Sequence, residues 1–146
     1  MNRHFVEMLS ALSDANAEFL IVGAHAVAAH GHYRATKDID IWINPSPENV
    51  VRVWDALREF GAPLHQLSPA DLMTPGTIYQ IGVDPIRIDL LTAVEPLAFA
   101  EAWANRAIVT VDSQPWPFLG REDLIRSKRA AGRPHDLKDI EALEQF

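Results

Sequence analysis

Aspartate alternates with isoleucine in one short hydrophobic stretch of this chain, Asp-Ile-Asp-Ile-Trp-Ile at residues 38–43. In a β-strand, residues two apart point to the same face, so Asp38 and Asp40 share one face while the isoleucines line the other. Residues 86–91, Ile-Arg-Ile-Asp-Leu-Leu, repeat this arrangement around Asp89. The pattern predicts two strands that each pack an apolar face into a core and together present three carboxylates from the opposite face.

Helical and strand-like segments alternate along the rest of the chain. Apolar residues at helical spacing, together with capping residues, predict helices at 3–15, 24–30, 46–61, 96–104, 121–131 and 135–145. Short apolar runs predict strands at 19–22, 38–43, 77–82, 86–91 and 107–111, with a hairpin turn at 83–85. Residues 114–119 contain two prolines and are expected to form a loop or a sheet edge. We therefore expect one α/β (α+β) domain over residues 1–146, with a mixed central sheet of about four to five strands flanked by helices.

The composition excludes several classes of protein. The chain has 146 residues and a net charge of −7, which argues against broad, non-specific nucleic-acid binding. It has no cysteine, so it holds no disulfide, zinc–thiolate site or thiol nucleophile. No apolar run approaches the roughly 20 residues that span a bilayer, and the first residues lack the apolar stretch of a signal peptide. We expect a cytoplasmic protein with no membrane partner.

The three carboxylates are candidate metal ligands. Converging acids repel one another and shift their pKa values unless a cation balances them. Oxygen ligands suit a hard divalent ion such as Mg²⁺ or Mn²⁺, and such ions can position a triphosphate and activate a hydroxyl, with the third acid as ligand or base. The sequence therefore indicates a metal site at Asp38, Asp40 and Asp89. The alternative is that these acids are purely structural.

A glycine turn precedes the first acidic strand. The strand at 19–22 ends at Gly23, and the helix that follows would present the backbone N–H groups of Ala24 and His25 at its N-terminus, where an anion such as phosphate is favoured. Gly23 has no side chain and allows close approach to the backbone. The alternative is an ordinary tight turn between a strand and a helix.

A basic segment lies near the C-terminal end of the chain. Six of the thirteen Lys and Arg residues fall between Arg121 and Lys138. Lys128, with Arg129 or Arg133, could contact a triphosphate or a charged acceptor; the alternative is a solvated helix face. On the first interpretation, loss of the Lys128 side chain should weaken nucleotide binding with little effect on the fold.

Five further side chains have two interpretations each. His25, His30 and His32 suggest a metal site, but their spacing favours polar residues at a helix end, with His25 at the turn as the exception. Trp42 shares the acidic face of its strand and could stack on a base or pack in the core. Arg87 lies on the same face as Asp89, with which it can pair.

Together these motifs resemble the nucleotidyltransferase superfamily that includes polymerase beta. The resemblance rests on Gly23-Ala24, thirteen intervening residues, the Asp38-Ile39-Asp40 motif and the later Asp89. Residues 22–31 and 34–40 look most like the AbiEii/AbiGii-type toxin branch and its single-domain relatives, and segment 128–139 is similar to that branch's late Lys…Asp motif. The resemblance spans residues 19–140, nearly the whole chain.

The resemblance implies transfer of a nucleoside monophosphate, with Mg²⁺ or Mn²⁺, from an NTP to a hydroxyl of RNA (for example tRNA) or of a protein. A cognate toxin or antitoxin would be a further partner. The residue roles it implies are metal ligands at Asp38 and Asp40, a third acid at Asp89, phosphate contacts at Gly23 and Ala24, a nucleotide contact at Lys128, and a late acid at Asp136 or Asp139. Two alternatives stay open: a non-catalytic nucleotide-binding or protein-interaction module with this fold, and a toxin–antitoxin component that acts by binding a partner.

Overall fold

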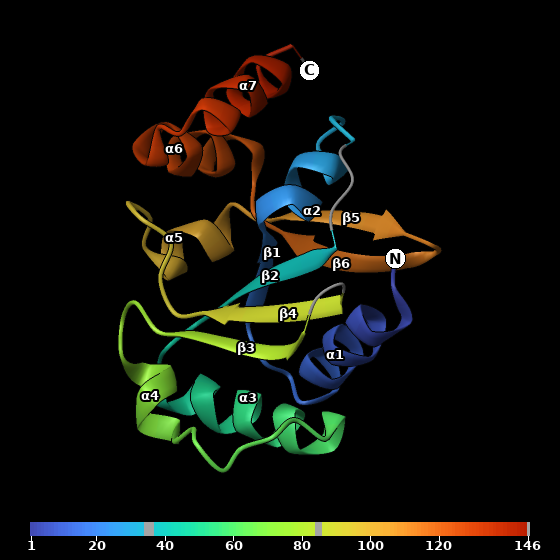
Figure 1. Cartoon of the computed structure of the whole chain (residues 1–146), viewed down its shortest axis with the longest axis vertical. Helices are drawn as coiled ribbons and strands as arrows, with labels where there is room; N and C mark the ends of the chain where they lie inside the picture. Colours follow the sequence, from blue (N-terminus) through green and yellow to red (C-terminus); the bar gives the residue numbers. More distant parts are fainter. Residues whose placement is uncertain (34–36, 84–85, 146) are drawn as a thin grey trace.

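A computed structural model of the chain describes residues 1–33, 37–83 and 86–145 (Figure 1). The residues of the predicted hairpin turn at 84–85, and residues 34–36 of the motif that resembles the toxin branch, lie outside this range. The described residues form a six-stranded mixed sheet in the order β3-β4-β2-β1-β6-β5. The strands are β1 (Phe19–Val22), β2 (Asp38–Ile43), β3 (Ile78–Val83), β4 (Ile86–Leu91), β5 (Ala107–Val111) and β6 (Gln114–Phe118).

The two acidic strands are neighbours in the sheet. β2 and β4 run parallel, and their register sets Asp40 beside Asp89 and Asp38 beside Arg87. β1 pairs antiparallel with β2 on the other side, with Val22 opposite Asp40. The three acids predicted from the alternating pattern therefore lie on adjacent strands, and the end of β1 reaches the same place.

The segment at 114–119, expected to be a loop or an edge, contains an internal strand. β6 pairs antiparallel with β5 on one side and meets β1 on the other, where Phe118 lies beside Ile21. This strand raises the number in the sheet from the expected four to five to six.

The two prolines of β6 are tolerated because of the hairpin register. A two-residue turn with positive φ at Asp112 and Ser113 joins β5 to β6. Counting from the closing pair of such a hairpin, hydrogen-bonded and non-hydrogen-bonded pairs alternate. Pro115 and Pro117 fall at the non-hydrogen-bonded positions, so neither removes a hydrogen bond from the pairing with β5.

Seven helices surround the sheet within the described part of the chain. They are α1 (Arg3–Asp14), α2 (Gly23–Ala29), α3 (Pro47–Phe60), α4 (Pro69–Met73), α5 (Phe99–Ala104), α6 (Arg121–Ala131) and α7 (Pro134–Leu143). Figure 1 shows α3 and α4 at one end of the molecule and the α6–α7 pair at the other, beyond α2 and α5. None of these helices has the length and apolarity needed to cross a membrane.

The helix boundaries follow local capping chemistry. The Ser46 side chain accepts a hydrogen bond from the N–H of Asn49 at the start of α3, and Pro47 occupies the first turn. The same helix ends at Gly61, which has a left-handed φ of 88°. α6 ends in the same way at Gly132, with a φ of 63°.

One hydrophobic core joins the helices to the sheet. Its largest fully buried side chains include Trp42, Phe19, Phe118, Met8 and Leu9. Trp42 packs edge-on against Phe99, with ring centroids 5.1 Å apart. This indole is 1% exposed, so the packing interpretation of Trp42 is confirmed and stacking on a nucleotide base is wrong.

Candidate active site

The acidic cluster consists of Asp38, Asp40 and Asp89, on one face of β2 and β4. Asp89 is 7% exposed, and Asp38 and Asp40 are half-buried. Burial raises the pKa of Asp40 from 3.8 to about 6, and the charges of Asp89 and Asp38 and a hydrogen bond with Asp89 add to this rise. The positive charge of Arg87 opposes it. The Asp40 carboxyl is therefore easier to protonate than an ordinary aspartate.

Arg87 spans two of the three acids. Its Nε donates to Oδ1 of Asp89 at 2.9 Å, and one terminal nitrogen donates to Oδ2 of the same residue at 3.2 Å. That terminal nitrogen also lies 3.0 Å from Oδ2 of Asp38. The predicted pairing of Arg87 with Asp89 is thus present, and the contact with Asp38 is an addition that residue spacing on one strand does not reveal.

Gly23 lies directly against the acidic cluster. Its φ is 68°, and a Cβ placed on it would come within 2.3 Å of Oδ2 of Asp40. This contact follows from the register that sets Val22 opposite Asp40. Glycine is therefore required here both for its backbone conformation and for the space that Asp40 occupies.

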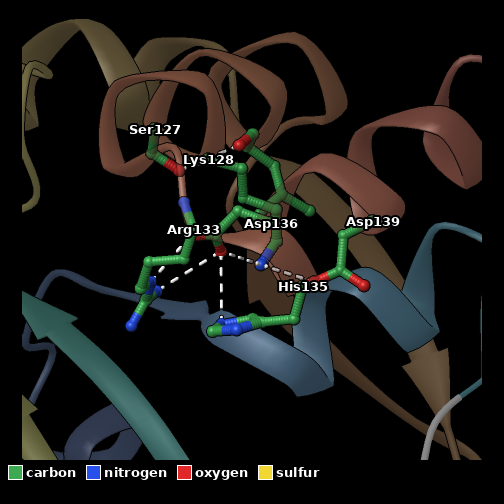
Figure 2. Close-up of polar contacts among 7 residues, drawn as sticks. Ser127, Lys128, Arg133, His135, Asp136 and Asp139 are labelled. Atoms are coloured by element: carbon green, nitrogen blue, oxygen red, sulfur yellow. Dashed lines mark hydrogen bonds and ion pairs between the residues drawn. The ribbon is translucent and has the colours of Figure 1, made fainter.

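Lys128 lies on α6 and is not solvated. The residue is 8% exposed; its ammonium group lies 2.9 Å from Oδ2 of Asp139 and 3.5 Å from Oδ1 of Asp136. Figure 2 shows these side chains converging from α6 and α7. The alternative of a solvated helix face is wrong for Lys128, and its two buried ion pairs argue against the expectation that its removal has little effect on the fold.

Asp136 is the centre of a second cluster, which it forms with Lys128, Arg133 and Asp139. It is fully buried, and Arg133 donates to it from its Nε at 2.7 Å and from its backbone N–H at 3.2 Å (Figure 2). Burial alone would raise the pKa of Asp136, but the hydrogen bonds from Arg133 and the charge of Lys128 hold it below its ordinary value. Asp136 therefore stays ionised and fixes both cations.

A cavity of about 310 Å³ is lined by residues of both clusters, although Asp38 and Asp89 of the acidic cluster are not among them. Gly23 and Asp40 line it from the sheet, and Lys128, Arg133 and Asp136 line it from α6 and α7. This volume is at the small end of the range for ligand sites, roughly 300–1,000 Å³. Residues more than a hundred positions apart in the sequence thus form the walls of one hollow.

The cavity includes residues that the sequence patterns did not indicate. Leu91, Val94 and Leu124 provide apolar lining, while Ser127 and Glu95 add polar groups. Glu95 lies beyond the end of β4, in a segment with no regular alternation. Its position just after an acidic strand is the one sequence feature that points to a role in the site, because the loops that follow strands often carry functional side chains.

Three residues predicted to bind nucleotide lie away from the cavity wall. Arg129 pairs with Glu144 on the outer surface of α6 at 2.9 Å, and Ala24 is not among the lining residues. His25 lines a separate hollow and meets Phe5 edge-on at 5.6 Å. Burial lowers its pKa, as does the charge of the N-terminus, and a backbone hydrogen bond at Asp38 opposes both.

His30 lies directly after the last residue of α2, where a polar helix-end residue was predicted. Its Nε2 is 2.8 Å from the carbonyl oxygen of Leu119. This contact supports the interpretation of His30 as a polar helix-end residue.

The donor chemistry of the acidic cluster fits a hard divalent cation. Asp38, Asp40 and Asp89 offer only carboxylate oxygens, and Asp40 and Asp89 lie side by side on parallel strands. In the described residues, no three His, Asp or Glu side chains are already arranged around one point as metal ligands. The guanidinium of Arg87 instead contacts oxygens of both Asp38 and Asp89.

Comparison with known protein families gives one match that covers almost the whole chain. Residues 3–144 match the family described as "Nucleotidyltransferase of unknown function (DUF6036)". No curated protein matches the chain. The match supports the superfamily that the sequence motifs resemble; the AbiEii/AbiGii-type branch stays a hypothesis.

Solved structures with the same fold are nucleotidyltransferases with low sequence identity. A proposed nucleotidyltransferase from Thermotoga maritima has 16% identity and a TM-score of 0.64, over 98% of this chain and 89% of that one. The lincosamide antibiotic adenylyltransferase LnuA, solved with lincomycin, has 13% identity and a TM-score of 0.63, over 99% and 96%. ANT(2'')-Ia, solved with adenylyl-2''-tobramycin, has 16% identity and a TM-score of 0.63, over 95% and 84%.

Asp40→Asn is expected to stabilise the fold at neutral pH. Folding raises the pKa of Asp40 from 3.8 to about 6, so the wild-type protein loses stability relative to the variant as pH rises through this interval. At about 1.4 kcal/mol per pKa unit, the gain approaches about 3 kcal/mol at pH 7 and falls to about 0.5 kcal/mol near pH 4. Urea unfolding of the wild type and the variant, with a chelator at pH 7 and at pH 4, measures this difference in the free energy of unfolding. The exposed Asp55→Asn is the control, and an equal effect of Asp40→Asn at both pH values would contradict the prediction.

Gly23→Ala should be coupled energetically to Asp40. A left-handed φ costs alanine about 1–2 kcal/mol, and Gly61→Ala measures that cost alone because nothing lies within 4 Å of its added Cβ. At Gly23 the clash with Asp40 should add about 1 kcal/mol, which an Asp40→Ala background should remove. Chemical denaturation of Gly23→Ala, Gly61→Ala, Asp40→Ala and the Gly23→Ala/Asp40→Ala double variant checks this. If Gly23→Ala costs the same stability with and without the Asp40 side chain, the contact does not exist.

Lys128→Met should destabilise the protein by about 3 kcal/mol, because it removes the ammonium group that contacts the buried carboxylates of Asp136 and Asp139. Arg129→Met removes the same charge from the next position of the same helix, but its ion pair with Glu144 is exposed, so its cost should stay below about 1 kcal/mol. Denaturant unfolding at pH 7 compares the two variants. Equal costs would argue against a structural role for the buried cluster.

Proposed function

We propose, since the chain belongs to a family of nucleotidyltransferases of unknown function, that it transfers a nucleoside monophosphate from an NTP to an acceptor hydroxyl. In such a step the acceptor oxygen bonds to the α-phosphorus as the bond to pyrophosphate breaks. The observation that carries the proposal is the cavity of about 310 Å³, which sets Gly23 and Asp40 opposite Lys128 and Arg133.

The sheet wall is suited to the cation and the reacting phosphate. Asp38 and Asp40 would hold Mg²⁺ or Mn²⁺, and Asp89 beside Asp40 would act as a further ligand or as a base. When bound, the ion would supply positive charge to the phosphates at the α-phosphorus. Gly23 carries no side chain that would meet the carboxylate of Asp40, so the glycine turn and this acid can both lie at the cavity wall.

The helical wall is suited to the remaining phosphate charge. Arg133 has a largely exposed side chain and lines the cavity, so it has more freedom to contact a ligand than the buried Lys128. Lys128 is oriented by Asp136 and Asp139 and contributes a fixed charge. Arg129, on the outer surface, is better placed for an acceptor such as RNA than for the nucleotide itself.

The acceptor is proposed to be a hydroxyl of RNA or protein, as the motifs imply. Two of the similar structures were solved with small antibiotic ligands, lincomycin and adenylyl-2''-tobramycin. A small-molecule hydroxyl therefore belongs among the acceptors to be tested. A cognate toxin or antitoxin partner also stays a hypothesis, and toxicity on expression that disappears when the neighbouring gene is co-expressed would support it.

A non-catalytic nucleotide-binding module is the second candidate function. One observation favours it: Arg87 already uses both oxygens of Asp89 and one of Asp38. A protein of this kind would bind NTP in the same cavity without transferring any part of it.

Incubation with each α-labelled NTP and Mg²⁺ tests the proposal, with cell RNA, cell protein or a panel of small polyhydroxylated molecules as acceptors. We expect one acceptor class to become labelled by the wild-type protein, and Asp38→Asn or Asp40→Asn to lower labelling by at least about a hundredfold. Gly61→Ala, remote from the cavity, is the control for general damage.

Thermal melting with and without Mg²⁺ and NTP separates the two candidates. Ligand-dependent stabilisation without any labelling would support the binding module. Stabilisation that persists unchanged when both Asp38 and Asp40 are replaced by asparagine would overturn the assignment of these acids.

A further inference from the structure

Arg87 is a charged side chain within the acidic cluster that the proposed function does not use. It precedes Asp89 by two residues, so both point from the same face of β4, and the parallel register sets it beside Asp38. Its side chain is 28% exposed. Arginine differs from lysine here because its planar fork can contact two carboxylates at once.

The contacts of Arg87 use the oxygens that a divalent cation would need. Both oxygens of Asp89 accept hydrogen bonds from the guanidinium, at 2.9 and 3.2 Å. One oxygen of Asp38 lies 3.0 Å from the same group. A cation that binds these acids must therefore either share them with Arg87 or displace it, and the two positive charges repel each other at such distances.

We propose that Arg87 is the internal counter-cation of the acidic cluster and that it limits the affinity of this cluster for divalent cations. The inference rests on the proposed function, since it takes the acids to be metal ligands. Arg87 is a positioning residue: it holds Asp38 and Asp89 in place, and its release from Asp38 makes that carboxylate available. Strand pairing keeps Asp40 beside Asp89 whether or not Arg87 is present.

Removal of Arg87 should therefore tighten metal binding rather than weaken it. Loss of the competing guanidinium frees three carboxylate oxygens and removes a nearby like charge, and both effects act in the same direction. A residue with only a structural role would give the opposite result, since its loss would loosen the acids and lower the affinity. The sign of the change in affinity thus distinguishes the two roles.

Direct Mn²⁺ binding, followed by the EPR signal of the free ion without nucleotide, tests the inference on the full chain. Arg87→Met should bind Mn²⁺ about tenfold or more tightly than the wild type. Arg87→Lys, which keeps the charge, should stay closer to the wild type. Arg3→Met removes one charge from an exposed pair with Glu7 and should leave the affinity unchanged.

Thermal melting gives an independent readout. In a chelator, Arg87→Met should melt below the wild type because Asp89 loses its partner, and Mn²⁺ should raise its melting temperature by more than that of the wild type. Arg87→Gln provides the same comparison if the methionine variant does not fold. Equal or weaker Mn²⁺ binding by the folded neutral variants would overturn the inference while leaving the metal site of the proposed function intact.

Asp40→Asn separates failure of the inference from failure of the proposed function. In the Arg87→Met background it should abolish the tight Mn²⁺ binding. Undiminished binding in that double variant would show that the ion binds elsewhere, which would overturn both proposals.

Discussion

The parallel pairing of β2 with β4 is the constraint on which the candidate site depends. It sets Asp40 beside Asp89 and Asp38 beside Arg87, so the spacing of the acids is determined by backbone hydrogen bonds rather than by flexible side chains. The resulting repulsion is visible in the pKa of Asp40, which burial and its acidic neighbours raise to about 6. Gly23 then fits only because it has no Cβ to meet Asp40. The glycine turn and Asp40 are therefore in direct van der Waals contact, and a side chain at residue 23 would displace the acid.

The carboxylates on the two sides of the cavity are paired with cations to different extents. On the sheet, within the described part of the chain, the guanidinium of Arg87 contacts two of three carboxylates, Asp38 and Asp89. On α6 and α7, Lys128 and Arg133 are matched by Asp136 and Asp139 in a mostly buried network (Figure 2). Such networks contribute less to stability than their contacts suggest, because desolvation offsets the attraction. Their effect is to orient the groups they contain, which suits residues that face a ligand.

Much of the fold could be predicted from local pattern, and much of the site could not. The alternation in residues 38–43 and 86–91 determines which side chains share a face, and the structure confirms those strands. The strand at 114–118 was missed because its prolines argue against a strand, and only the register of the hairpin makes them acceptable. The burial of Lys128 was missed because its acidic partners lie on the next helix, and no periodicity within α6 reports a contact with α7. Its ion pair with Asp139 is a tertiary contact between two helices.

The neutrality of the α6–α7 wall has a consequence for how a nucleotide would enter. Two cations and two carboxylates cancel formally there, and the sheet side carries a surplus of negative charge. Under the proposed function, a bare triphosphate meets repulsion from one side and no net attraction from the other. It would be accepted as its complex with a divalent ion or after one has bound, which is an ordered mechanism.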